Sequence, residues 1–297
     1  TPSPEISAYA TPFKNPKHQH QLQAPNTPFK LGLQVEKIDK LTHKSVLITF
    51  EPIDQTLPFN AGQYVVISHL FNNQQLSRCY SICSVPGASQ LQIAVKQTTN
   101  GVMSSYLTEQ LRCGDYLTVS GAFGDFTYQP SQTLPVLLIA AGSGITPMMS
   151  IIKTALSSKS TNKVTLIYCN KSIADCMFYD TLQVLAAQNS DRLSIVWCWS
   201  NPQAVEAYDT TKARLDETLL TEIMQSLPAQ QLSYICGPES LTSWVQPTLV
   251  KLGILPQNIV CELFNTPIKK PSDVANERTY QVEVIDNGAS KQFNATS

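Results

Sequence analysis

A glycine-rich turn between an apolar run and an amphipathic run is the segment of this sequence best suited to bind an anion. Gly142 and Gly144 follow the apolar residues 135–141, and Pro147 opens the amphipathic residues 148–156. Glycine lets the backbone approach a ligand closely, and proline suits the first helical position, where an N–H has no partner to lose. Because a helix N-terminus carries free N–H groups and a positive dipole, the pattern predicts a strand, a phosphate-binding turn and a helix.

The run Arg78-Cys79-Tyr80-Ser81 offers a second set of groups, on a predicted strand. Side chains of a strand alternate, so Arg78 and Tyr80 share one face while Cys79 and Ser81 share the other. A guanidinium binds phosphate through planar donors, and an aromatic ring packs against a flat ring system. The pair therefore suits a flavin nucleotide; an exposed arginine beside a core tyrosine is the structural alternative.

Two further segments begin predicted helices. Gly101 precedes Ser104, a predicted N-cap, and the glycine lets backbone N–H groups face an anion, although capping alone explains this segment equally well. Cys236 ends a predicted strand, and Gly237 and Pro238 follow it. Ligands of open α/β sheets bind where the strands end, so this segment is a candidate binding edge. A buried structural thiol is the alternative for Cys236.

Two predicted domains position these segments. Residues 29–130 show short alternating runs separated by turn residues, which is typical of a small antiparallel β-barrel. The predicted strands are 31–35, 45–50, 64–68, 91–95 and 116–119, with one helix at 104–111. Residues 131–267 alternate strands and helices, which predicts a doubly wound parallel sheet. Its predicted strands are 136–141, 164–168, 193–199 and 232–235, and its predicted helices are 148–156, 174–187, 215–227 and 241–252.

The two ends of the chain differ from these domains. Residues 1–28 are rich in proline, glutamine and asparagine and are predicted to be a mobile tail. Residues 268–278 form a predicted linker, and residues 279–297 a predicted hairpin around Asn287-Gly288. Since a two-stranded hairpin alone is marginally stable, we expect it to be the start of a truncated domain.

Composition excludes several classes of protein. The hydrophobic fraction of 42% is too high for a disordered chain, and a net charge of −1 without a basic block argues against nucleic acid as a partner. The eight cysteines lack metal-ligand spacing, which predicts free thiols and no metal site. No apolar run reaches the ~18 residues of a membrane span, and no signal peptide is recognisable. We therefore expect a cytoplasmic protein.

Taken in order along the chain, these motifs resemble those of the ferredoxin–NADP reductase superfamily. Arg-x-Tyr-Ser matches its flavin motif, Gly-x-x-Ser its flavin pyrophosphate motif, Gly-x-Gly-x-Thr-Pro its nicotinamide dinucleotide motif, and Cys-Gly-Pro its nicotinamide edge. The resemblance covers roughly residues 29–267. It implies an antiparallel β-barrel flavin domain followed by an α/β doubly wound parallel-sheet nucleotide domain.

The resemblance also implies roles for individual residues. Tyr80 would pack on the flavin ring, and Ser81 would hydrogen-bond near its N5 atom. Cys236 would lie beside the reacting nicotinamide carbon, Glu262 would relay a proton, and Phe264 would cover the flavin. The remaining cofactor-binding residues implied are Arg78, Val95, Lys96, Gly101, Val102, Met103 and Ser104 for flavin, and Gly142, Gly144, Thr146, Pro147, Gly237 and Pro238 for the dinucleotide.

The activity implied is hydride transfer from NADH to FAD, followed by release of single electrons to a [2Fe–2S] centre and a protein acceptor. FMN in place of FAD, and NADPH in place of NADH, stay open. The hairpin resembles the first strands of a plant-type ferredoxin, so the cluster would belong to a longer chain. That arrangement is similar to NADH:hybrid-cluster-protein reductases and oxygenase reductases, which implies a hybrid-cluster protein or an oxygenase component as acceptor. A non-catalytic electron-transfer subunit and a nucleotide sensor are the alternatives.

Overall fold

The computed structural model describes residues 29–53, 57–157, 162–201 and 214–264, and the backbone of residues 279–286 and 289–296. The predicted tail, linker and Asn287-Gly288 turn lie outside the described residues. The chain divides into one compact unit that ends at Phe264 and a second that begins at Asn265. Among the helices described, none is long and apolar enough to cross a membrane.

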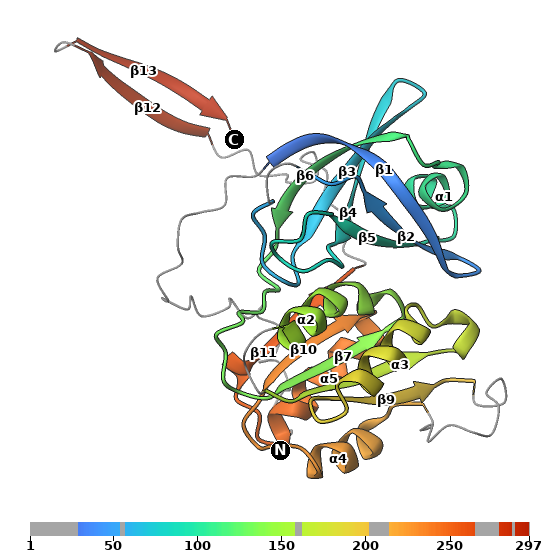
Figure 1. Cartoon of the computed structure of the whole chain (residues 1–297). Coiled ribbons are helices and arrows are strands. Elements are labelled where there is room, and N and C mark those ends of the chain that lie inside the picture. Colours follow the sequence, from blue (N-terminus) through green and yellow to red (C-terminus); the bar gives the residue numbers. More distant parts are fainter. Residues whose placement is uncertain are drawn as a thin grey trace, which may run out of the picture. The chain divides into compact units, whose positions relative to one another are not determined.

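The first part of the chain is an antiparallel sheet that curls on itself (Figure 1). Its strands are β1 Phe29–Thr42, β2 Ser45–Phe50, β3 Tyr64–Phe71, β4 Gln74–Ser81, β5 Gln92–Lys96 and β6 Tyr116–Phe123. They lie in the order β4-β3-β6-β1-β2-β5. A bridge between Ile82, just after β4, and Ile93 on β5 joins the two edges of the sheet. The predicted antiparallel barrel is therefore confirmed.

A short helix packs against the barrel core. It comprises α1, Val102–Ser105, and a π-helical turn, Tyr106–Gln110. The helix predicted at 104–111 therefore begins two residues earlier than expected. Met103 and Leu107, one turn apart, are both about 1% exposed, so their burial sets the start and orientation of this helix.

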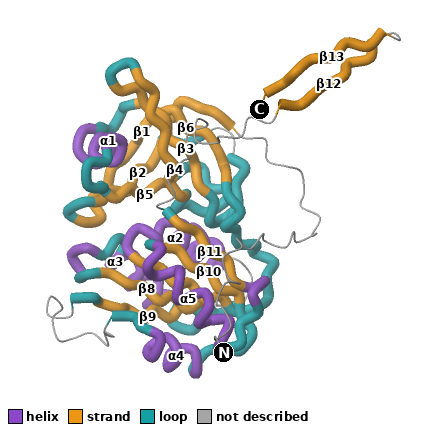
Figure 2. The backbone as a smooth tube through the Cα atoms, turned by 180° about the vertical axis from the view of Figure 1, so that it is seen from behind, coloured by secondary structure: helices purple, strands orange, loops and turns teal. Residues whose placement is uncertain are grey.

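The second part is a parallel sheet with helices on both faces (Figure 2). Its strands lie in the order β11-β10-β7-β8-β9. Their bounds are β7 Val136–Ala141, β8 Val164–Asn170, β9 Leu193–Trp199, β10 Leu232–Gly237 and β11 Ile259–Leu263, and the helices are α2 Ile145–Ser157, α3 Tyr179–Gln188, α4 Glu217–Gln225 and α5 Glu239–Lys251. Residues of α2 and α3 share one apolar cluster, and residues of α4 and α5 another. The predicted doubly wound sheet is confirmed.

Two helix starts differ from the predictions. Helix α2 begins at Ile145, after a 3₁₀ turn over Gly142–Gly144, so Pro147 is its third residue rather than its first. Pro147 has no N–H for the Ser143 carbonyl, and that oxygen accepts a hydrogen bond from the Thr146 hydroxyl at 3.0 Å instead. Helix α3 begins at Tyr179 rather than at 174, because Phe178 adopts a left-handed conformation (φ 60°) that interrupts the helix.

The second unit contains two paired strands. β12, Thr279–Asp286, runs antiparallel to β13, Ala289–Thr296, in an unbroken register from Thr279–Thr296 to Asp286–Ala289. This pairing is the hairpin that the sequence predicts.

Candidate functional site

The Ser81 side chain at the end of β4 is buried without a partner. It is 4% exposed, and the register of β3 and β4 sets it opposite Tyr64. Its Oγ atom has no hydrogen-bond partner among the described residues. A buried hydroxyl left without a partner costs about 1–3 kcal/mol, so a ligand atom that hydrogen-bonds Ser81 Oγ would remove this cost. A flavin bound at the end of β4 fits this requirement.

Arg78 and Tyr80 lie on one face of β4, as predicted. The register pairs Arg78 with Ile67 and Tyr80 with Val65, without a shift. Arg78 is exposed, and its Nη1 atom donates to the Ser77 carbonyl at 2.8 Å. Tyr80 is partly buried, and this burial raises the pKa of its phenol, which therefore stays neutral. An exposed guanidinium beside a partly buried neutral ring matches a ligand with one anionic and one flat apolar part.

The turn before α1 differs from the prediction in one residue. Gly101, not Ser104, is the N-cap residue, with φ −82° and ψ 99°. The Ser104 hydroxyl is used inside the turn, where it accepts from the Thr98 N–H at 3.1 Å and donates to the Gly101 carbonyl at 3.0 Å. A Cβ on Gly101 would lie 2.1 Å from Thr98 Oγ1, which excludes a larger residue. An anion at this turn would therefore contact the backbone N–H groups of Val102 and Met103 rather than the serine hydroxyl.

The nucleotide turn packs tightly on the end of β10. A Cβ on Gly144 would lie 2.0 Å from the Cys236 carbonyl oxygen, so only glycine fits there. Gly142 has φ 54°, in the left-handed region that favours glycine. Gly237 lies close to β7. A Cβ atom added to Gly237 would be only 3.2 Å from the Ala141 Cβ atom. The three glycines place the turn at the C-terminal edge of the sheet, where dinucleotides bind in this fold class.

The side-chain ammonium group of Lys96, a barrel residue, lies near this turn. Lys96 ends β5, and its Nζ atom would lie 3.8 Å from a Cβ on Gly142. Its neighbour Val95 is fully buried in the barrel core and fixes the strand end. The resemblance implies a cofactor-binding role for Lys96, and the structure places its Nζ atom near the predicted dinucleotide turn. The positive charge and the glycine turn together suit a diphosphate.

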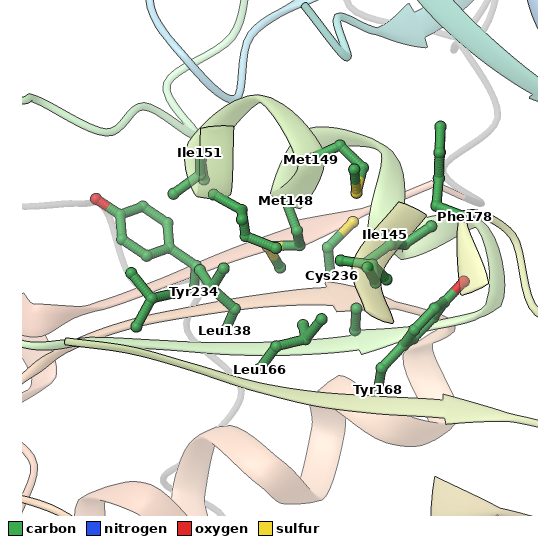
Figure 3. Close-up of a cluster of buried hydrophobic side chains, with 14 of the residues drawn as sticks. Leu138, Ile145, Met148, Met149, Ile151, Leu166, Tyr168, Phe178, Tyr234 and Cys236 are labelled. Atoms are coloured by element: carbon green, nitrogen blue, oxygen red, sulfur yellow. The ribbon is translucent and has the colours of Figure 1, made fainter. Parts of the chain in front are cut away.

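Cys236 is a buried thiol. Its side chain is 0% exposed, and Figure 3 shows it below Met148 and Met149 of α2. Burial, and then the charge of Glu262, raise the pKa of the thiol, so it remains protonated. In this arrangement the structural alternative describes Cys236 better than direct contact with a ligand. Pro238 follows as the N-cap residue of α5.

Glu262 on β11 is partly buried and faces the barrel, and its Oε2 atom is buried. Burial raises its pKa from 4.5 to about 7, and its Oε2 atom has no partner among the described residues. A Cβ atom added to Gly124 would lie 3.8 Å from the Glu262 Oε1 atom. The atoms nearest to that added Cβ would belong to the Tyr64 ring. Glu262 therefore lies with Tyr64, the residue opposite Ser81, at the boundary of the two domains. Phe264, 39% exposed, follows it.

Sequence reasoning missed Tyr64 and Gly124 as members of this site. Neither was expected to bind a ligand, and each approaches Glu262 only because the chain folds across more than a hundred residues of sequence. The described residues contain no group of three metal-ligating side chains arranged to hold an ion. All eight cysteines are free thiols.

Comparison with known proteins matches both domains to families. Residues 32–128 match an oxidoreductase FAD-binding domain, and residues 138–246 match an oxidoreductase NAD-binding domain. The chain is 34% identical to a component of the 1,2-phenylacetyl-CoA epoxidase of Escherichia coli K12 over 273 residues, 88% of this chain and 76% of that protein. It is 30% identical to NADH oxidoreductase HCR of the same organism over 216 residues, 71% of this chain and 61% of that protein.

Solved structures agree with this assignment. The FAD/NAD-binding domain of nitric oxide dioxygenase from Vibrio cholerae superposes with a TM-score of 0.69 at 25% identity, over 78% of this chain and 98% of that one. The cytochrome P450 reductase GcoB of Amycolatopsis has the same fold, with a TM-score of 0.71 at 21% identity, over 82% of this chain and 72% of that one. The chain is a flavin-dependent reductase with FAD-binding and NAD-binding domains, and it belongs to the ferredoxin–NADP reductase superfamily.

Proposed function

We propose that this protein transfers a hydride from NADH to FAD and passes single electrons to a [2Fe–2S] centre, and from there to a protein acceptor. The observation that carries the proposal is the buried, unpartnered Ser81 hydroxyl at the end of β4. It lies at the boundary with the domain that holds the Gly142–Gly144 turn, so one site serves both cofactors. Bound FAD accepts a hydride and releases electrons one at a time, a chemistry that belongs to the cofactor.

The barrel residues hold the flavin. The Arg78 guanidinium and the N–H groups at the start of α1 bind the pyrophosphate, while the neutral Tyr80 ring packs on the flavin ring. The Ser81 hydroxyl donates a hydrogen bond near the reacting nitrogen, which satisfies its buried oxygen. Two phosphate-binding elements favour FAD over FMN, since FMN has a single phosphate.

The sheet residues hold the dinucleotide. The turn with Gly142 and Gly144 binds the diphosphate together with Lys96. Thr146 and Pro147 fix that turn, and Gly237 with Pro238 form the edge beside it. Cys236 contributes a neutral apolar wall under the turn rather than a charged group.

Glu262 controls a proton at the domain boundary. With a pKa of about 7, its carboxyl is divided between its two protonation states at neutral pH. Such a group gives or takes a proton at little cost, here at an Oε2 atom that has no partner among the described residues. Phe264 follows Glu262 and covers the exposed side of the flavin ring until the dinucleotide binds.

The acceptor is an oxygenase component or a hybrid-cluster protein. Relatives named as part of an epoxidase, an NADH oxidoreductase and the ferredoxin reductase component of a mycobacterial monooxygenase support this range. We place the [2Fe–2S] centre in a ferredoxin-like domain that starts with β12 and β13, and the protein in the cytoplasm. NADH is the proposed donor.

An anaerobic titration tests the proposal. The visible spectrum of the FAD-loaded protein is recorded before and after one equivalent of NADH. Loss of the oxidised flavin absorbance supports hydride transfer from NADH, and loss with NADPH alone corrects the choice of donor. A flavin that neither nucleotide reduces, in a protein that still binds FAD, contradicts the proposal and leaves a non-catalytic electron-transfer subunit. Turnover of ferricyanide with NADH distinguishes the reductase from a nucleotide sensor.

A further inference from the structure

Two polar side chains of α2 reach across the domain boundary to the segment that follows Ser81. The Ser150 hydroxyl donates to the Ser84 carbonyl at 2.6 Å. The Lys153 ammonium donates to the Cys83 carbonyl at 3.0 Å. Both acceptors lie within three residues of Ser81, so α2 holds the backbone that positions this hydroxyl.

The same segment also contacts the start of α2. The Cys83 thiol donates to the Thr146 carbonyl at 3.5 Å, and Thr146 is the second residue of α2, directly after the nucleotide turn. The Cys83 N–H donates to the Gln92 carbonyl on β5 at 2.8 Å. The start of α2 and its middle therefore both hydrogen-bond to residues 83–84. These two residues are in turn hydrogen-bonded to β5 of the barrel through Cys83.

The position of Lys153 is not explained by its contribution to the stability of the folded protein. This lysine is half-buried, its second acceptor is the Gln92 side-chain oxygen at 3.5 Å, and the ion pairs among the described residues do not include it. Burial lowers the pKa of its ammonium. A cation removed from water without a carboxylate is unfavourable compared with an apolar side chain of similar length. Its hydrogen bonds therefore provide geometry rather than net stability.

Apolar packing already joins the two domains. Barrel residues Ala61, Cys83 and Phe126 share one buried cluster with Met148, Met149 and Ile151 of α2, and Figure 3 shows the three α2 residues lying over the sheet. Apolar contacts hold surfaces together without fixing their register, whereas hydrogen bonds have a defined direction. The hydrogen bonds of Ser150 and Lys153 thus fix the register of the two domains, which the apolar cluster does not fix.

We infer that Ser150 and Lys153 are positioning residues for hydride transfer, which fix Ser81 and the flavin beside it relative to the nucleotide turn that opens α2. The inference rests on the proposed function. Productive transfer requires reacting atoms held about 3–3.5 Å apart, and a displacement of about 1 Å costs on the order of 10²-fold in rate. A helix that contacts both binding sites is suited to set that separation.

Two substitutions test the inference, each on the FAD-loaded protein. Ser150→Ala removes one oxygen atom, and Lys153→Met keeps the side-chain length while removing the charge and the donors. The limiting rate constant of flavin reduction, measured by anaerobic stopped flow, is expected to fall about tenfold in each variant. The FAD content and the Kd for NADH are expected to stay within about twofold of wild type, because neither side chain contacts a cofactor-binding residue by its own hydrogen bonds.

The controls separate positioning from a purely structural role. Lys251→Met, on an α5 lysine with 71% side-chain exposure, is expected to leave the rate constant unchanged. Lys153→Arg is expected to recover most of the rate, since the guanidinium keeps the charge and several donors. A structural role would lower the Tm of Ser150→Ala and Lys153→Met while leaving the limiting rate constant at the wild-type value.

Wild-type limiting rates in Ser150→Ala and Lys153→Met would overturn the inference, as would a raised Kd for NADH with an unchanged limiting rate. If Lys153→Met does not fold, Ser150→Ala decides, because it removes only one oxygen atom. Failure of the proposed function is a different result, since it shows in the wild-type protein as a flavin that neither NADH nor NADPH reduces.

Discussion

Glu262 on β11 and Tyr64 on β3 meet at Gly124, on the boundary between the barrel and the parallel sheet. A Cβ on Gly124 would lie 3.0 Å from the Tyr64 ring and 3.8 Å from the Glu262 Oε1 atom. Burial, followed by the charges of Cys79 and Glu262, raises the pKa of the Tyr64 phenol. The carboxyl is thus held in a poorly solvated space beside a neutral ring, and its own pKa rises accordingly.

This carboxyl gives stability a definite dependence on pH. In the folded protein its pKa is about 7, above the ordinary value of 4.5, so the folded state binds the proton more tightly. Its contribution is most favourable below pH 4.5 and is lost as the pH rises through 7, by at most about 3 kcal/mol. Glu262→Gln is expected to raise the free energy of unfolding at pH 8 and to change it little at pH 4.5, as measured by urea unfolding. Glu222→Gln, at an exposed position on α4, should show no such difference; an equal gain at both pH values for Glu262→Gln contradicts the assignment.

Ser81→Ala should separate flavin binding from flavin reduction. The hydroxyl has no protein partner among the described residues, so its removal relieves a buried polar atom and leaves the fold intact. The rate constant of reduction by NADH is expected to fall by tenfold or more, about 1.4 kcal/mol, while the Kd for FAD changes less. Stopped-flow reduction and flavin fluorescence measure the two quantities. A rate within about twofold of wild type, roughly 0.4 kcal/mol, would show that Ser81 is not at the reacting atom.

Arg78→Ala should weaken flavin binding rather than chemistry. The exposed guanidinium contacts only the Ser77 carbonyl in the hydrogen bonds described, so its loss removes a phosphate partner and little packing. We expect the purified variant to contain little FAD, judged by the ratio of absorbance at 450 nm and 280 nm, an approximate guide to flavin content. Arg112→Ala, which removes an exposed guanidinium elsewhere in the barrel, serves as the matched control. An Arg78→Ala protein as yellow as this control would disprove the phosphate role.

Gly144→Ala should disrupt the nucleotide turn. The added Cβ would lie 2.0 Å from the Cys236 carbonyl oxygen, so the turn must move away from β10. The Kd for NAD⁺ is expected to rise by at least about tenfold, some 1.4 kcal/mol, while FAD remains bound. Gly32→Ala on β1 meets no atom within 4 Å and should leave both affinities unchanged. Isothermal calorimetry with NAD⁺ gives the comparison, and equal affinities of Gly144→Ala and wild type would refute the packing argument.

The sequence predicts the architecture well because its signals are local. Alternation predicts the barrel strands, and apolar runs between amphipathic segments predict the sheet. The errors occur where contacts inside a turn decide a boundary, as at Ser104, whose hydroxyl accepts from the Thr98 N–H instead of capping α1. Left-handed Phe178 delays α3 in the same way. Lys153 could not be predicted at all, because its acceptor Cys83 is 70 residues away in the chain.

The hydrogen bond from the Thr146 hydroxyl to the Ser143 carbonyl has a consequence for affinity. Pro147 removes one backbone donor, and the threonine replaces it, so the turn is closed by its own atoms. A loop that stiffens only around its ligand loses conformational entropy during binding, whereas this turn loses it during folding. The turn proposed to bind the dinucleotide is therefore ordered before the ligand arrives, and bound phosphates would not need to order it.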